Sequence, residues 1–232
     1  MSKDVRTAIL KASVVQLRKV GTNNFSLSYV AHMIGASKTT VYKHFPNKEE
    51  VFLALFKENL EQRLSTGRAL RHCDSLTSLE KVIAYYSIGI IRRRQHTHQI
   101  GLNFLPTNIH LYKKARPELI EDVHSKLQQN HRFPRFFLDE AIECDAITVP
   151  TSLRHETLLD LLMIERGLVC NLMNFGLESY YSGLPNIYFI DKLLVPLKSI
   201  NWLSLPLPSS TSVEKWVNNR IRTSGSVIGV SP

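Results

Sequence analysis

The chain contains 232 residues, of which 44% are hydrophobic and 21% are charged, and its formal net charge is +9. This length allows one large domain or two small ones, and the hydrophobic content is ordinary for a globular protein with a substantial core. The excess of Lys and Arg favours an anionic partner such as nucleic acid. No apolar run approaches the ~20 residues that cross a membrane, and the charged first segment argues against a signal peptide, so we expect a cytoplasmic protein.

Neither a disulfide framework nor a metal site is expected. The three cysteines are widely spaced: Cys73, Cys144 and Cys170. Scattered thiols in odd number are typical of reduced, mostly buried cysteines, and Cys73, which follows a basic pair, is the best candidate for a redox role. Three histidines match no metal-ligand spacing: His96, His98 and His110. The sequence therefore predicts no metal and no cofactor.

The first predicted helix runs from Asp4 to Val20. Apolar residues recur along it at helical spacing, and Gly21 ends it. We expect this helix to pack across the segment that follows. Together with five apolar residues of that segment it should complete a small core: Phe25, Val30, Ile34, Val41 and Phe45.

Two short helices are predicted next, each with its own start and stop signal. Ser26 is a good N-cap for the first, and Gly35 supplies the positive φ that ends it. Ser37 caps the second, Lys38–His44. Two short helices joined by a turn that contains glycine define a helix-turn-helix.

The residues after this pair predict a third helix start. Pro46 ends the preceding helix, because the residue before a proline avoids the α region. Asn47 is the N-cap of the next helix, and Glu50 follows in capping-box position. The free backbone N–H groups of this helix start, together with Lys48, favour a phosphate site.

The helix at 38–44 has an outer face without acidic residues. Its polar or amphipathic members are Lys38, Thr39, Thr40, Tyr42, Lys43 and His44. Hydroxyl, amine and imidazole groups suit a helix in the major groove of DNA, where they meet base edges and phosphates. A face that is merely solvated usually mixes charges of both signs. The pattern therefore indicates a DNA-recognition helix.

The segment from Ser26 to Glu50 resembles the DNA-binding signature of the tetracycline-repressor (TetR) family of transcriptional regulators. The most specific part is G-A-S-x-x-x-V-Y-x-H-F-x-N-K, from Gly35 to Lys48. The resemblance implies an all-α fold, with an N-terminal three-helix DNA-binding domain, a larger C-terminal helical domain, and a homodimer on a pseudo-palindromic operator. The candidate DNA-binding residues are Ser26, Ser28, Lys38, Thr39, Thr40, Tyr42, Lys43, His44 and Lys48.

We expect a DNA-binding domain over residues 1–48, a helical regulatory and dimerisation domain over 49–203, and a linker, a short helix at 211–222 and a flexible tail over 204–232. The helix at 47–70 is too long for the small domain alone and is expected to link the two. Prolines divide much of the remainder. The other predicted helices are 75–94, 107–113, 117–130, 134–145, 152–181 and 185–200.

The helix predicted at 152–181 is apolar around nearly its whole circumference. A single chain covers one face, so we expect a partner subunit to cover the other. This helix and the next one resemble the pair with which the family dimerises as a four-helix bundle. Periodicity does not decide which stripe faces the partner. The candidate interface residues are Leu161, Leu168, Leu172, Phe175, Leu193 and Leu197.

The family resemblance also implies a small-molecule effector in the C-terminal domain, which would move the helix at 47–70 and change the separation of the recognition helices. A coupling free energy of ~1–3 kcal/mol is enough to alter DNA affinity 5- to 150-fold. The sequence identifies neither the effector nor the operator, and a repressor is the expected form. Candidate pocket residues, each equally suited to the core, are Tyr85, Tyr86, Ile90, Phe104, Tyr112, Phe136, Phe137, Met163 and Met173.

Two other functions stay open. The helix-turn-helix could serve only protein–protein contacts, and salt-dependent binding to duplex DNA separates this alternative from a DNA-binding role. A helical enzyme is the weaker alternative, because the chain has no nucleophile elbow, phosphate-binding loop, zinc-protease motif or dinucleotide-binding glycine pattern.

Overall fold

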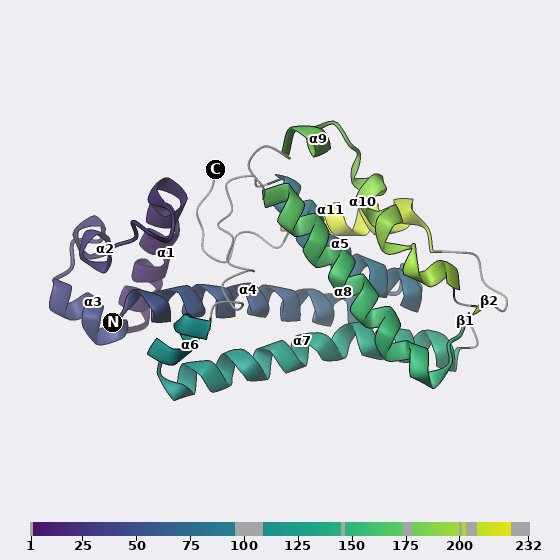
Figure 1. The fold of residues 1–232 in the computed structure, drawn as a ribbon, viewed down its shortest axis with the longest axis horizontal. Helices are drawn as coiled ribbons and strands as arrows, with labels where there is room; N and C mark the ends of the chain where they lie inside the picture. The colour runs from purple at the N-terminus through teal and green to yellow at the C-terminus, as the bar shows by residue number, and fades with distance from the viewer. Residues whose placement is uncertain are drawn as a thin grey trace. The chain divides into compact units, whose positions relative to one another are not determined.

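The computed structural model describes residues 2–95, 109–144, 147–173, 178–199, 201–202 and 208–223. Within these ranges the fold is all-α, as predicted, with one two-residue strand pair. The helices are α1 (Ser2–Val20), α2 (Leu27–Met33), α3 (Lys38–His44), α4 (Lys48–Arg71), α5 (Ser78–Gln95), α6 (Ile109–Lys114), α7 (Pro117–Glu143), α8 (Thr151–Met173), α9 (Glu178–Ser182), α10 (Asn186–Leu193), the 3-10 helix η2 (Pro196–Ser199) and α11 (Ser210–Thr223) (Figure 1). The antiparallel strands are β1 (Ile147–Thr148) and β2 (Asn201–Trp202), with Ile147 opposite Trp202.

The chain divides into two compact units. Of the described residues, one unit contains 2–62 and 109–128, and the other contains 63–95 and 129–223 with the gaps given above. Both α4 and α7 therefore contribute residues to each unit. In the part of the chain that the structure describes, no helix is long and apolar enough to span a membrane.

The core of the first unit is the one predicted for the helix-turn-helix. Ile9 and Leu17 of α1 are buried against Val30 of α2 and Val41 of α3. Phe25 packs edge-on against Phe52 of α4, with ring centroids 5.2 Å apart. This core extends to Leu111 of α6, which the sequence analysis had not placed there. Burial of these side chains holds α1, α2 and α3 in a fixed arrangement.

The second unit is built around α5, which packs against α8, α10 and α11. The apolar face of α5 is buried, as its sequence predicted, and α11 contributes the fully buried Val213 and Val217. Helix α11 begins one residue before the predicted start at 211, and its N-cap is Ser209, because the Ser209 hydroxyl accepts a hydrogen bond from the Ser212 N–H at 3.2 Å. The Ser209 N–H donates in turn to Glu80 at 2.9 Å, which ties the start of α11 to α5.

The predicted break at Pro134 is wrong, since α7 runs without interruption through this residue. A proline inside a helix removes one N–H donor and leaves the carbonyl four residues earlier without its usual partner. That carbonyl belongs to Asn130, and the Tyr85 hydroxyl donates to it at 2.9 Å. A tertiary hydrogen bond thus replaces the missing helical one, and the helix continues.

Other predicted boundaries also shift. Of the helix predicted at 152–181, the described parts are α8 and α9, and residues 174–177 lie outside the described residues. The helix predicted at 185–200 is two shorter pieces, α10 and η2, because Pro196 cannot donate a backbone hydrogen bond and begins a new turn. Cys144 and Cys170, expected to be buried, are exposed.

Candidate nucleic-acid interface

The helix-turn-helix is held by the caps that the sequence predicted. The Ser26 hydroxyl accepts from the Tyr29 N–H at 3.4 Å at the start of α2. The Ser37 hydroxyl accepts from the Thr40 N–H at 3.0 Å at the start of α3. Gly35 between them has φ of 65°, a left-handed conformation that favours glycine. These local contacts set the angle between α2 and α3.

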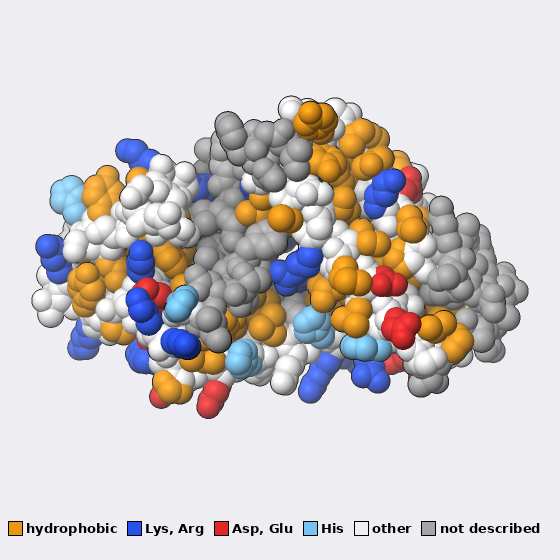
Figure 2. Space-filling model, in the orientation of Figure 1, with side chains coloured by type: hydrophobic (Ala, Val, Ile, Leu, Met, Phe, Trp, Pro, Cys, Tyr) orange, Lys and Arg blue, Asp and Glu red, His pale blue; other side chains and the backbone are white. Residues whose placement is uncertain are grey.

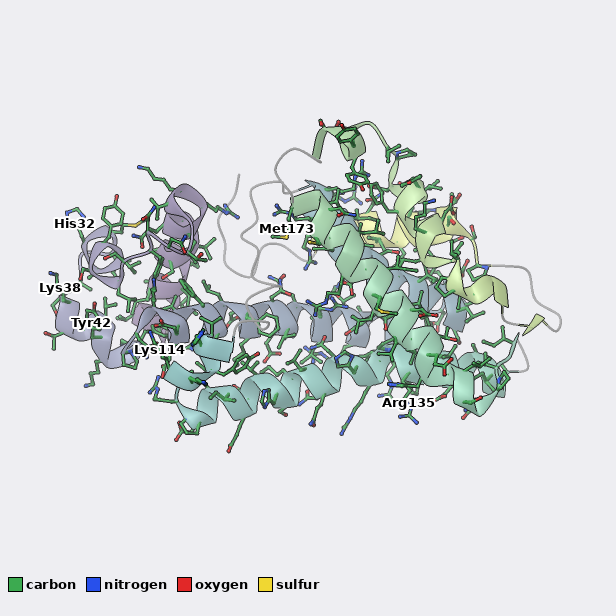
Figure 3. The ribbon with its side chains drawn as sticks, in the orientation of Figure 1. His32, Lys38, Tyr42, Lys114, Arg135 and Met173 are labelled. Carbon is green, nitrogen blue, oxygen red and sulfur yellow. The ribbon has the colours of Figure 1, made fainter. Side chains whose placement is uncertain are left out.

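The outer face of α3 is exposed, as a recognition helix requires. Lys38, Thr39, Tyr42 and Lys43 are exposed, whereas Val41 on the opposite side is completely buried. Figure 3 shows Lys38 and Tyr42 pointing away from the core of this unit. Lys and Arg side chains surround α2 and α3 in Figure 2. Side chains of this kind can donate to phosphates and to base edges in the major groove.

The remaining candidate residues are half-buried or belong to a helix cap. The Thr40 hydroxyl lies 2.8 Å from the Ser37 hydroxyl, so it belongs to the N-cap of α3. Ser26 is exposed, and Ser28, His44 and Lys48 are half-buried. Thr39 is therefore a cleaner probe of base contact than Thr40, because its replacement disturbs no described hydrogen bond.

A pair on α2 was missed by the sequence analysis. The rings of Tyr29 and His32 stack with centroids 6.3 Å apart and planes 24° apart. Tyr29 is 49% exposed, and His32 is exposed beside it. The spacing i, i+3 on a helix could have indicated this pair, but the exposed face of α2 contains no charged run that draws attention to it.

A second missed feature is a polar clamp behind α3. The carboxylate of Glu50, on the first turn of α4, is completely buried and accepts hydrogen bonds from the Arg116 side chain at 2.7–3.0 Å and from the Arg116 backbone N–H at 3.0 Å. Arg116 also donates to the His44 carbonyl at the end of α3, at 3.4 Å. The predicted N-cap of α4 is confirmed, since the Asn47 side chain accepts from the Glu50 N–H at 2.9 Å, but the Glu50 carboxylate binds Arg116 instead of closing a capping box.

Lys114 and Asn47 extend this clamp. The Lys114 ammonium pairs with Glu49 at 3.0 Å. The backbone carbonyl of Lys114 accepts a hydrogen bond from the Asn47 side chain at 2.9 Å. The hydrogen bonds to Glu50 raise the pKa of the Arg116 guanidinium, which stays charged at any physiological pH. The clamp joins the end of the recognition helix to the segment between α6 and α7, all within the first unit.

Arg116→Ala should lower the free energy of unfolding by about 1–3 kcal/mol, because it leaves a buried carboxylate without its cation. Lys114→Ala is the matched control. The Lys114 side chain is 62% exposed and its partner Glu49 is 12% exposed, so this carboxylate keeps contact with water and loss of the pair should cost at most about 1 kcal/mol. Urea unfolding of both variants measures the difference. Equal costs would show that the burial of Glu50 does not depend on Arg116.

The predicted effector residues that the structure describes lie in different environments. Tyr85, Tyr86, Ile90 and Phe137 are buried in the core of the second unit. Phe136 and Met163 are exposed by 40% and 62%, and Met173 is half-buried. Tyr112 belongs to the first unit, and Phe104 lies outside the described residues.

The sequence analysis missed a charged pair that lies beside the buried effector candidates. Arg63 on α4 donates to Glu165 on α8 through two nitrogens, at 2.6 and 3.2 Å. Its guanidinium lies 5.2 Å from the centre of the Tyr85 ring. Gly89 makes room for the carboxylate, since a Cβ at that position would lie 2.7 Å from the Glu165 Oε1 atom. This pair lies in the interior of the second unit, next to two of the predicted pocket residues.

The candidate interface residues also differ in how deeply they are buried within one chain. Leu161, Leu193 and Leu197 are buried within a single chain, so they leave no surface for a partner. Leu168 and Leu172 are half-buried, and Phe175 lies outside the described residues. The buried stripe of α8 consists of Thr157, Leu161, Glu165 and Val169. The exposed apolar stripe consists of Leu159, Met163, Gly167 and Cys170.

Exposed cations on α3, capped short helices and a glycine turn define a helix-turn-helix DNA-binding protein. Residues 9–55 match the family model of the bacterial regulatory proteins, tetR family. This segment therefore carries the DNA-binding domain of that family of transcriptional regulators.

Solved structures agree with this fold over nearly the full chain. A protein described as a TetR-family transcriptional regulator from Mesorhizobium loti is 16% identical, with a TM-score of 0.58 over 94% of this chain and 98% of its own. The ketosteroid transcriptional regulator KstR2 of Mycobacterium tuberculosis is 15% identical, with a TM-score of 0.54 over 86% and 96%. RolR in complex with resorcinol is 13% identical, with a TM-score of 0.53 over 90% and 97%. A search of curated protein sequences finds no match.

Proposed function

We propose that this protein is a dimeric, sequence-specific repressor in the cytoplasm that a small molecule releases from its operator. The observation that carries the DNA-binding part is the exposed, acid-free face of α3, held by two serine caps. The proposal assigns DNA binding to residues 1–48, regulation and dimerisation to 49–203, and the link between them to the helix that begins after Asn47. The C-terminal segment 204–232 has no assigned role.

The proposed dimer would form through the exposed apolar stripe of α8. Leu159 and Met163 are exposed by 41% and 62%, and nothing lies within 4 Å of the position where Gly167 would bear a Cβ. Figure 2 shows hydrophobic side chains on the surface over α8. A glycine in an apolar stripe lets a second helix approach closely. The same stripe of a second copy is its natural cover, because two-fold dimers use one surface on both subunits.

Met163→Glu should dissociate this dimer without unfolding the chain. The Met163 side chain is mostly exposed in one chain, so a carboxylate there remains hydrated in the monomer and becomes buried only in the dimer. Sedimentation at micromolar concentration should show the wild-type protein as a dimer and the variant as a monomer of 26.5 kDa. Val15→Glu, at a residue of α1 that is 40% exposed, is the control and should remain dimeric. A wild-type monomer would contradict the proposed dimer.

The proposed effector site lies in the second unit. Among structures with a similar fold, RolR was solved with resorcinol and KstR2 is named for ketosteroids. By analogy, a ligand in the helical unit of this protein would bias α4, whose residues belong to both units. A coupling of ~1–3 kcal/mol would then change operator affinity 5- to 150-fold.

Salt-dependent binding to duplex DNA tests the proposed function against a helix-turn-helix that contacts only proteins. Fluorescence anisotropy with labelled duplex should show a logarithmic affinity that falls linearly with the logarithm of salt concentration, with a slope of about −0.9 for each phosphate neutralised. Affinity that does not change with salt would favour the protein-contact alternative.

A further inference from the structure

The second unit contains a surface groove that the proposed function does not use. Its volume is about 290 Å³, and it lies between the last turns of α4 and the middle of α7. Three apolar side chains form its floor: Leu64, Phe133 and Phe136. Three guanidinium groups surround them: Arg68, Arg71 and Arg132. The α4 members follow at i, i+4 and i+7, so they share one face of the helix.

The floor of this groove is closely packed. The Phe133 ring lies directly on the backbone of Gly67, where a Cβ would be only 2.4 Å from the ring. The Arg71 guanidinium lies over the Phe136 ring, 4.9 Å from its centre. Such stacking limits the rotation of both side chains and leaves the N–H edges of Arg71 available to a ligand.

The arginines of the groove differ from two other basic residues of α7 in that they form no described ion pair. Outside the groove, Lys126 pairs with Glu61 and Asp122, and Arg135 pairs with Asp139. Within the described residues, none of the three groove arginines has an acidic partner within 4.0 Å. Three uncompensated cations around an apolar floor favour an anion with an apolar body.

We propose that this groove binds a small aromatic carboxylate, with the ring on Phe133 and Phe136 and the carboxylate held by Arg68 and Arg132. A planar guanidinium matches a carboxylate in two parallel hydrogen bonds. The volume accommodates a one- or two-ring compound. Phe136 is the one candidate effector residue in this groove, whereas the buried candidates Tyr85, Tyr86, Ile90 and Phe137 do not line it, and binding to it requires no DNA.

Isothermal titration of the full-length protein with 2-naphthoate tests the proposal. Wild-type protein should bind the carboxylate at least about tenfold more tightly than the uncharged 2-naphthylmethanol, because each charge-assisted hydrogen bond is worth more than one factor of ten. Arg68→Gln and Arg132→Gln should each weaken 2-naphthoate binding by at least about tenfold. Arg135→Gln is the matched control on α7 and should leave binding unchanged. Figure 3 shows Arg135 on this helix.

The three substituted arginines are exposed, so the variants should remain folded, and circular dichroism checks this. Absence of 2-naphthoate binding to the wild-type protein would overturn the proposal, as would equal binding by Arg68→Gln and Arg135→Gln. Equal affinities for 2-naphthylmethanol and 2-naphthoate would show that the arginines do not select the carboxylate, and this result would also overturn the proposal. Competition by inorganic phosphate as strong as by 2-naphthoate would identify an inorganic-anion site and overturn the role of the aromatic floor. None of these outcomes bears on operator binding.

Discussion

Glu165→Gln is expected to lower the free energy of unfolding by about 3–5 kcal/mol. Glu165 is 2% exposed, and its carboxylate is the only acidic partner of Arg63 among the described residues. The substitution preserves the shape of the side chain but removes the charge, so the guanidinium stays in the interior without compensation. Burial by itself would lower the pKa of Arg63, and the adjacent carboxylate raises it instead.

Urea unfolding followed by circular dichroism measures this cost. Asp139→Asn is the control, since Asp139 and its partners Arg154 and Arg135 are all at least about one-third exposed, and its cost should be at most about 1 kcal/mol. The double variant Arg63→Met with Glu165→Leu should recover most of the lost stability, because a buried ion pair can be replaced by apolar side chains at little cost. If Glu165→Gln cost no more than Asp139→Asn, the pair would not be a buried one in solution.

Lys38→Glu combined with Lys43→Glu is expected to weaken operator binding on the order of 10³-fold, because it removes two phosphate contacts and places two carboxylates against the DNA. Both lysines are exposed on α3, so the folded state should be unaffected. The matched control carries Lys215→Glu and Arg222→Glu on α11, which changes the net charge by the same −4. Fluorescence anisotropy at fixed salt compares the two.

The control separates a local contact from the general attraction of a basic protein to DNA. A shift in total charge alone would weaken binding equally in both double variants. A loss confined to the α3 variant supports a recognition helix, and equal losses would contradict it. Thr39→Ala then tests base contact, since it should weaken operator binding more than binding to random duplex.

The parts of the fold that follow from local chemistry could be predicted from the sequence. The caps at Ser26, Ser37 and Asn47 and the turn at Gly35 depend on residues at most three positions apart, so the pattern contains all the information needed. The exposed face of α3 follows from the same local pattern. These features account for the correct prediction of a DNA-binding domain of this family, and the individual DNA-binding residues stay predictions.

The rest depends on contacts between distant residues. Helix α7 continues through Pro134 because Tyr85, 45 residues from Asn130, donates to the freed carbonyl. Glu50 meets Arg116 across 66 residues, and Arg63 meets Glu165 across 102. The exposed stripe of α8 could not be distinguished from the buried one because apolar residues lie on both and the buried one also contains Thr157 and Glu165, so only the packing of α5 against α8 decides between them.

The proposed function depends on recognition of a two-fold DNA site by a pair of α3 helices. Selection of bound duplexes from a random library with the full-length protein, at about physiological salt, followed by sequencing, tests this most directly. We predict enrichment of an inverted repeat whose half-site centres lie about one helical turn apart, roughly 34–36 Å along the DNA or a multiple of it. Recovery of no enriched sequence, or of a site without inverted symmetry, would contradict a dimeric operator-binding regulator.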